Sequence, residues 1–227
     1  MEMINKKYIF LIVFILLIAQ NLFAQSDDFA IRTGVEIKKD FRKGFGLSLE
    51  YQYRRNQNLT RFQASYVSIS PSYKINKYFS TSAEFRYGTS HVWDRYRYAY
   101  YISAKNNFKK LEVSARVGYL YETFAQEVLE IDQFPSTNNM RFRLEADYKI
   151  SKKIKVSVSS EPIITLQHGL DMRQMRNIIE FDWEFMKNQE ISLSYLQMPQ
   201  FSSELYISSN HILQLNYILS IAKKSKL

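Results

Sequence analysis

Residues 111–122 read Leu-Glu-Val-Ser-Ala-Arg-Val-Gly-Tyr-Leu-Tyr-Glu, and this stretch decides the fold. Apolar residues occupy every odd position, whereas glutamate, serine, arginine and glycine occupy most of the even ones. Because successive side chains of a strand point to opposite faces, a period of two separates an apolar face from a polar one. The stretch therefore predicts a β-strand that is apolar on one side and polar on the other.

The same alternation recurs almost to the C-terminus, and no stretch after Phe29 keeps an apolar stripe at helical spacing for long. Eleven segments show it: 29–38, 45–54, 62–73, 79–88, 95–103, 111–122, 140–149, 154–158, 179–185, 191–195 and 213–219. In the third segment the phase changes between Tyr66 and Val67, which predicts a bulge there or a bend at Pro71. Strands therefore dominate the chain.

The links between these segments fall into two classes that alternate along the chain. Short links rich in lysine and asparagine lie near 39–43, 76–77, 106–110, 151–153 and 187–189, and longer irregular ones near 55–61, 88–94, 123–138, 164–174 and 199–205. This rhythm is typical of an up-and-down barrel with tight turns at one rim and longer loops at the other. No internal repeat or linker is visible, so residues 25–227 are predicted to form one domain.

The N-terminus has the order of a secretory signal peptide. Lys6 and Lys7 precede an apolar run over 8–19, and small Ala24 closes the segment. The run is shorter than the roughly 20 residues that a membrane-spanning helix needs. We therefore expect residues 1–24 to be a signal peptide cleaved after Ala24, and the protein to be exported.

Composition excludes several kinds of chemistry. The 227 residues include no cysteine, so disulfides, thiolate metal sites, cysteine nucleophiles and lipoprotein acylation are ruled out. Aromatic residues make up 15% of the chain, with 17 tyrosines, and the mean hydropathy of -0.32 argues against a bundle of membrane helices. The net charge of +9 is dispersed over turns and strands without a basic cluster, so we expect no nucleic-acid partner.

A membrane barrel is apolar outside and polar inside, and the segments favour that arrangement over a soluble barrel. Their length fits the roughly 9–11 residues with which a tilted strand crosses a bilayer. Tyrosines near segment ends are candidates for interfacial aromatic girdles: Tyr51, Tyr53, Tyr73, Tyr87, Tyr119, Tyr121 and Tyr148. We predict an all-β, single antiparallel up-and-down transmembrane barrel of about 10–12 strands in the outer membrane. Its partners would be outer-membrane lipid and, during biogenesis, the barrel-assembly machinery.

The polar faces mix charged with small residues, as a narrow lumen would require. Ten residues are predicted to form a charge network inside it: Glu84, Arg86, Arg95, Arg97, Arg116, Arg141, Arg143, Glu145, Asp147 and Glu180. Arginine can satisfy carboxylates across strands through bidentate pairs. The lumen is therefore expected to be charged and largely packed.

The strand count conflicts with a general rule, because bacterial single-chain barrels have even numbers of strands and eleven segments are present. Either segment 29–38 lies partly outside the barrel, which gives ten strands, or residues 122–135 hide a further strand, which gives twelve.

Several stretches together resemble an uncharacterised family of short outer-membrane barrels in Gram-negative bacteria, classed as a domain of unknown function. They are Asp-Asp-Phe-Ala-Ile-Arg-Thr-Gly-Val-Glu-Ile-Lys-Lys at 27–39, the strand at 46–54, Tyr-Lys-Ile-Asn-Lys-Tyr-Phe-Ser at 73–80 and Arg-Phe-Arg-Leu at 141–144. The resemblance covers nearly all of residues 25–227. It implies a barrel and a location, but no reaction.

Catalytic and metal sites find little support in the sequence. The three histidines, His91, His168 and His211, lack metal-ligand spacing, and no nucleophile elbow or phosphate loop is present. Two groupings could serve a lipid acyl hydrolase or transferase: His168 with Asp171, and His211 with Ser208 and Ser209. We expect neither an enzyme nor a cofactor.

Three function classes remain. The first is a structural or interaction barrel that acts through its loops, especially 123–138. The second is a narrow channel for small solutes, in which Arg86, Arg97, Arg116, Arg141 and Arg143 would favour anions. The lipid-modifying enzyme is the third. Circumference separates the first two, because barrels of about 8–10 strands are generally filled and about 12 strands can leave a narrow path.

Overall fold

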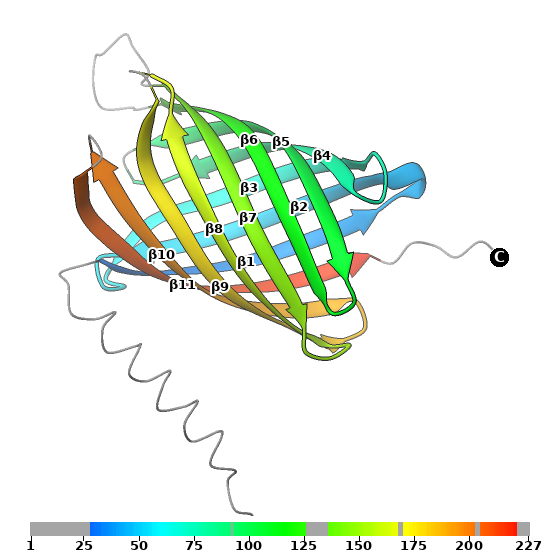
Figure 1. The fold of residues 1–227 in the computed structure, drawn as a ribbon. Coiled ribbons are helices and arrows are strands. Elements are labelled where there is room, and N and C mark those ends of the chain that lie inside the picture. The colour runs from blue at the N-terminus through cyan, green and yellow to red at the C-terminus, as the bar shows by residue number, and fades with distance from the viewer. Residues whose placement is uncertain (1–27, 92, 126–135, 168–169, 203–204, 222–227) are drawn as a thin grey trace, which may run out of the picture.

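Eleven strands wind into one closed barrel in the computed structural model, which describes residues 28–91, 93–125, 136–167, 170–202 and 205–221 (Figure 1). The strands are β1 (Phe29–Asp40), β2 (Phe45–Asn56), β3 (Arg61–Lys74), β4 (Phe79–Thr89), β5 (Asp94–Phe108), β6 (Leu111–Ala125), β7 (Ser136–Lys149), β8 (Ile154–Thr165), β9 (Asp171–Met186), β10 (Gln189–Ser202) and β11 (Leu205–Ile221). A short 3-10 turn, η1 (Arg42–Gly44), joins β1 to β2. In the part of the chain that the structure describes, no helix has the length and apolarity to cross a membrane.

The barrel closes through a parallel pair. Each strand pairs antiparallel with its neighbour in sequence, and β1 runs parallel to β11 from Phe29 opposite His211 to Lys39 opposite Ile221. The prediction of an all-β barrel is confirmed, and each of the eleven predicted segments lies within a strand. The expectation of an even strand number and of wholly antiparallel pairing was wrong. The first and last of an odd number of strands run in the same direction, and a parallel ladder joins them.

Residues 29–38 are therefore a full member of the barrel, contrary to the ten-strand alternative. For the twelve-strand alternative, residues 122–125 belong to β6, and residues 126–135 lie outside the described residues. The predicted signal peptide also lies outside them.

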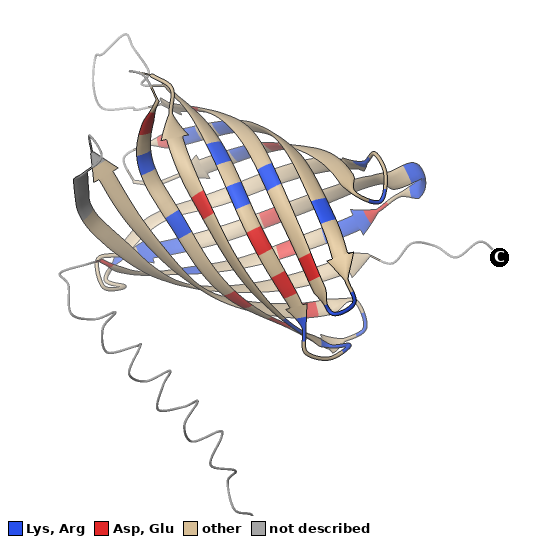
Figure 2. Cartoon of the chain, viewed as in Figure 1, with Lys and Arg blue, Asp and Glu red and all other residues tan. Residues whose placement is uncertain are grey.

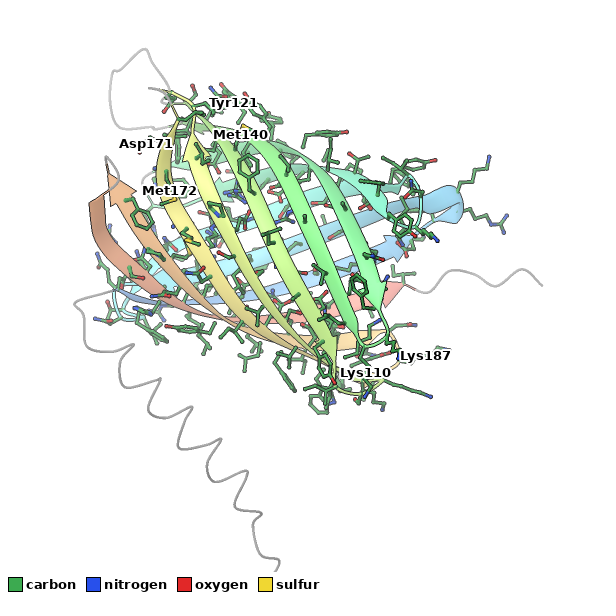
Figure 3. The ribbon with its side chains drawn as sticks, in the orientation of Figure 1. Lys110, Tyr121, Met140, Asp171, Met172 and Lys187 are labelled. Atoms are coloured by element: carbon green, nitrogen blue, oxygen red, sulfur yellow. The ribbon has the colours of Figure 1, made fainter. Side chains whose placement is uncertain are left out.

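The links alternate between two rims, as predicted. The turn rim carries 41–44, 75–78, 109–110, 150–153 and 187–188. The loop rim carries 57–60, 90–93 and 166–170, together with the ends of β6, β7, β10 and β11. Figure 3 shows Lys110 and Lys187 at the turn rim, and Tyr121, Met140, Asp171 and Met172 at the loop rim. The predicted difference in length was largely wrong, since of the loop-rim links only 126–135 is clearly longer than the turns. The strands continue beyond the alternating apolar and polar residues, because the neighbouring strands still supply hydrogen-bond partners for their backbone N–H and C=O groups.

Strand β3 corrects the prediction of a bulge at Tyr66-Val67. The strand is continuous there, and the bulge lies at Gln63, opposite Arg54 and Arg55. Tyr66 is buried on the lumen side. The sequence pattern seemed to change phase there because an aromatic residue occupies an inward-facing position. Pro71 does not end the strand, but the pairing of β3 with β4 is interrupted around it, because proline lacks a backbone N–H.

The predicted apolar faces point outward, and the exposed large apolar side chains form a band around the barrel. Representative exposed residues are Val35, Leu49, Val67, Phe85, Ile102, Val117, Leu144, Val158, Ile179, Leu193 and Leu215. The seven tyrosines predicted for the girdles are all half-buried or exposed on this outer face. Charge inside and apolar surface outside reverse the arrangement of a soluble protein, so the molecule is a transmembrane barrel.

Candidate functional site in the lumen

One arc of the lumen wall, from β2 to β6, carries a chain of ion pairs that we call the ladder. Arg86 lies 3.1 Å from Glu50 and 3.3 Å from Glu84, Arg97 lies 3.5 Å from Glu84 and 2.5 Å from Glu122, and Arg95 also pairs with Glu122. Guanidinium and carboxylate groups alternate along it, so each buried charge has opposite neighbours. Figure 2 shows that acidic and basic positions are interspersed along the strands.

The arc from β6 to β9 holds a looser group of ion pairs around Glu161. Glu161 Oε1 is 3.6 Å from Arg116 Nη2 and 3.8 Å from Arg141 Nη1, so one carboxylate serves two guanidinium groups at long distance. Nearer the turn rim, Arg143 pairs with Glu145, and Lys155 Nζ lies 3.0 Å from Asp182 and 3.9 Å from Asp147.

All ten residues predicted for the charge network occupy inward-facing strand positions. The structure divides nine of them among the ladder, the Glu161 group and the three pairs near the turn rim, and Glu180 lies beside Asp182 on the inner face of β9. Sequence reasoning missed Arg32, Arg54, Glu122, Glu161 and Arg176, which lie nearer the loop rim. Arg32, Arg54 and Glu122 already occupied polar positions of predicted segments, and extending the alternation toward the loop rim would have placed Glu161 and Arg176 inside as well.

Two tyrosines lie flat against the wall in the middle of the barrel because glycines face them. Tyr66 stands opposite Gly88, where an added Cβ would come within 2.4 Å of its ring, and Tyr101 stands opposite Gly118, where the distance would be 2.3 Å. Arg54 covers the Tyr66 ring at 4.1 Å, and Arg116 covers the Tyr101 ring at 4.8 Å. The glycines therefore determine how far these rings project into the lumen.

Above this level, toward the loop rim, the lumen widens into a cavity of about 360 Å³, which we call the vestibule. Among the described residues, its charged lining consists of the cations Arg32, Arg54, Arg95, Arg97, Arg141, Arg173 and Arg176 and the anions Asp28 and Glu122. Seven cations against two anions give it a formal charge of +5. Because a narrow cavity with low-dielectric walls focuses an electric field, this excess creates a strongly positive potential inside.

Four of these arginines, Arg32, Arg54, Arg173 and Arg176, form no ion pair with a carboxylate of the described residues. Arg54 Nε donates to Gln52 Oε1 at 2.6 Å, and Arg32 Nη2 contacts only Met198 Sδ at 3.6 Å. The Nε groups of Arg32, Arg141 and Arg176 are buried without a hydrogen-bond partner among the described residues. Arg32 and Arg176 also repel each other electrostatically. Buried guanidinium groups without partners are costly, so an anion would be bound favourably here.

Aromatic side chains line the other side of the vestibule. The ring centroid of Trp93 lies 6.5 Å from that of Tyr66 and 5.8 Å from that of Phe124. Trp93, Gln63 and Asn56 also line a smaller cavity of about 240 Å³, which contains Phe62 and His91. The two cavities are therefore adjacent, with the Trp93 indole between them.

The histidines do not assemble a catalytic site within the described residues. His91 is exposed, and its ring packs edge-on against Phe62 with 5.1 Å between the ring centroids. His211 Nδ1 lies 2.5 Å from the phenolic oxygen of Tyr195. His168 lies outside the described residues, so its proposed grouping with Asp171 is not seen. Nor does any group of three His, Cys, Asp or Glu in the described part of the chain have the geometry to hold a metal ion.

Comparison with known proteins gives one family and two solved structures. A family model described as a protein of unknown function, DUF2490, matches residues 31–204. A KdgM porin is 17% identical, with a TM-score of 0.47, and a KdgM porin in complex with disordered oligogalacturonate is 16% identical, with a TM-score of 0.48. Each match covers 75% of this chain and 91% of the other. No curated protein matches the chain.

Proposed function

The chain belongs to the DUF2490 family, and we propose that it forms a narrow, anion-selective passage across the outer membrane. Outer-membrane location is supported by the apolar outer band and by the predicted signal peptide at residues 1–24. Fractionation of cells, together with a heat-dependent shift in gel mobility, tests the location. Recovery of the whole protein from the soluble periplasm would contradict it.

The vestibule is the observation that carries the proposal. Its excess of five positive charges faces the loop rim, where solutes would arrive, and four of its arginines form no ion pair with a carboxylate of the described residues. An open pore lined by cationic side chains raises the local anion concentration and excludes cations. A purely structural barrel has no need of such an excess, because paired charges fill a lumen at lower cost.

The sequence alone favoured a packed lumen, and the ladder supports that interpretation for one arc only. Eleven strands give a circumference between that of filled small barrels and that of open ones. The ladder holds its arginines against the wall from β2 to β6, whereas Arg32 on β1 and Arg176 on β9 each have a buried Nε that lacks a hydrogen-bond partner among the described residues. A third reading, the lipid acyl hydrolase, finds no support in the described residues.

Conductance in a planar bilayer tests the proposed passage. The purified protein should open small, stable channels, and a KCl gradient should give a reversal potential on the anion-selective side. The double variant Arg54→Gln with Arg176→Gln should move that reversal potential toward zero, because it removes two unneutralised charges. Arg42→Gln, an exposed residue at the turn rim, is the matched control and should change it little. Absence of any conductance would reject the passage and leave the packed interaction barrel.

A further inference from the structure

We propose that the vestibule binds a small organic anion in which a carboxylate or phosphate group is joined to a flat ring. The inference rests on the proposed function for its biological meaning, but the site itself is defined by two facing walls. Arginines from β1, β7 and β9 form one wall, and aromatic residues from β3, β6 and the 90–93 link form the other, where Arg54 from β2 already covers the Tyr66 ring.

The cationic wall provides the anion-binding half. Arg32 and Arg141 are more than nine-tenths buried, and the Nε of each has no hydrogen-bond partner among the described residues. The Nε of Arg176 is also buried without a hydrogen-bond partner among the described residues. A planar guanidinium group matches the two oxygens of a carboxylate or phosphate, so an incoming anion would supply the missing hydrogen-bond acceptors.

The aromatic wall provides the ring-binding half. Tyr66, Trp93 and Phe124 form a continuous series of ring contacts, and the half-buried Trp93 borders both the vestibule and the smaller cavity. That smaller cavity adds Phe62 and His91 to the aromatic surface. Inorganic anions would leave this surface unused, whereas a ring attached to the anionic group would stack on it or enter the smaller cavity.

The ladder explains why the two walls differ. Arg95 and Arg97 reach the vestibule too, but both already pair with Glu122. The Nε of Arg95 has no hydrogen-bond partner among the described residues, but its guanidinium lies over the Phe124 ring at 5.1 Å. They therefore hold the aromatic side in place, and the ligand's charge is directed to the opposite wall.

Trp93 offers a direct readout, because the chain has only two tryptophans and Trp183 lies on the lipid-facing surface. In the Trp183→Phe variant, purified in detergent, Trp93 is the sole tryptophan. Titration with benzoate should quench its fluorescence saturably. Benzamide, which has the ring without the charge, should quench weakly, and acetate or inorganic phosphate should displace benzoate only at much higher concentration.

Arg176→Gln in this background should weaken benzoate binding about tenfold, as expected for the loss of one charge-assisted hydrogen bond. Arg42→Gln should leave it unchanged. Displacement by acetate at benzoate-like concentrations, equal quenching by benzamide, or no saturable quenching would each overturn the proposal. Because the measurement needs no current, conductance without benzoate binding would refute this inference alone, and binding without conductance would refute the passage alone.

Discussion

Glu122 is the residue on which the aromatic side of the vestibule depends most directly. Its carboxylate pairs with both Arg95 and Arg97, and it is buried at 5% exposure. Changing Glu122 to Gln would leave Arg95 without its counter-charge and Arg97 with Glu84 alone, and would raise the formal charge of the vestibule by one. Breaking a buried pair in this way costs about 3 kcal/mol or more. We expect the urea midpoint of the purified barrel to fall and its anion selectivity to rise.

Glu112→Gln is the matched control for this change. Glu112 pairs with Lys105 near the turn rim, and the Lys105 side chain is 47% exposed. An exposed pair of this kind contributes at most about 1 kcal/mol, so stability should change little. If the two variants lost equal stability, the ladder would have no special structural role.

Single residues also mark the limit of prediction from sequence. Period-two alternation is enough to place Arg86, Arg97 and Glu84 on the inner face. It cannot separate an arginine held by a carboxylate, such as Arg97, from one that is not, such as Arg54. That difference depends on which strand lies beside which and in what register, and these are long-range properties.

At the level of elements, the cross-strand pair of Tyr101 with Gly118 sets the width of the middle of the lumen. Gly118→Ala places a methyl group where the ring now lies, so the ring must turn into the lumen. Overpacking of this kind costs about 1–3 kcal/mol. We expect lower stability and lower single-channel conductance.

A second variant separates this explanation from a general backbone effect. Adding Tyr101→Ala to Gly118→Ala removes the ring that clashes, and should restore conductance to at least the value of the unchanged protein. A double variant that conducts as poorly as Gly118→Ala alone would show that the ring is not responsible.

The strands themselves were the best predicted part of the molecule, and their ends the worst. Alternation identified all eleven because lipid outside and charge inside impose opposite demands on successive residues. Strands such as β9 and β11 extend beyond the predicted segments, since near the loop rim the outer face no longer needs to be apolar while the backbone remains paired. The alternation in β3 was assigned to the wrong faces around Tyr66, because an aromatic residue can also point into the lumen when it packs against a glycine.

At the scale of the whole molecule, the parallel pairing of β1 with β11 is the feature that sequence could not supply. Thr33 and Leu215 are partners across this seam and both side chains face outward. Adjacent strands lie about 4.8 Å apart, within the range that a disulfide can bridge. The Thr33→Cys, Leu215→Cys variant, whose only cysteines are the two introduced, should therefore cross-link on oxidation, as seen by peptide mass spectrometry.

Thr33→Cys with Leu193→Cys is the control, because Leu193 pairs with Leu215 and lies one strand further from β1. That separation is about twice the strand spacing, too far for a disulfide. If only the control pair cross-linked, or neither did, the eleven-strand closure would be wrong.

Charge is distributed unequally along the whole lumen. The vestibule carries its positive excess at the loop rim, whereas acidic residues outnumber basic ones on the inner face of the turn half. The acidic residues are Glu36, Asp40, Glu112, Glu145, Asp147, Glu180, Asp182, Glu184 and Glu190, and the basic ones are Lys38, Lys74, Lys105, Arg143, Lys149 and Lys155. A passage with opposite charge at its two ends passes current unequally in the two directions. When the turn side is positive, cations enter through the acidic half and anions through the arginine half, so both accumulate in the middle and the current is larger.

This asymmetry should appear in about 0.01 M KCl, where charges act over about 30 Å, and disappear in about 1 M KCl, where they act over about 3 Å. Thr60→Cys at the exposed 57–60 link identifies the loop side of each inserted barrel, because a thiol reagent added to one chamber reaches that sole cysteine only from there. The Arg32→Gln, Arg54→Gln, Arg176→Gln variant should reduce the asymmetry by weakening the positive end. Equal currents at both polarities in low salt, or a larger current with the loop side positive, would show that the unequal charge of the two lumen halves does not control the current.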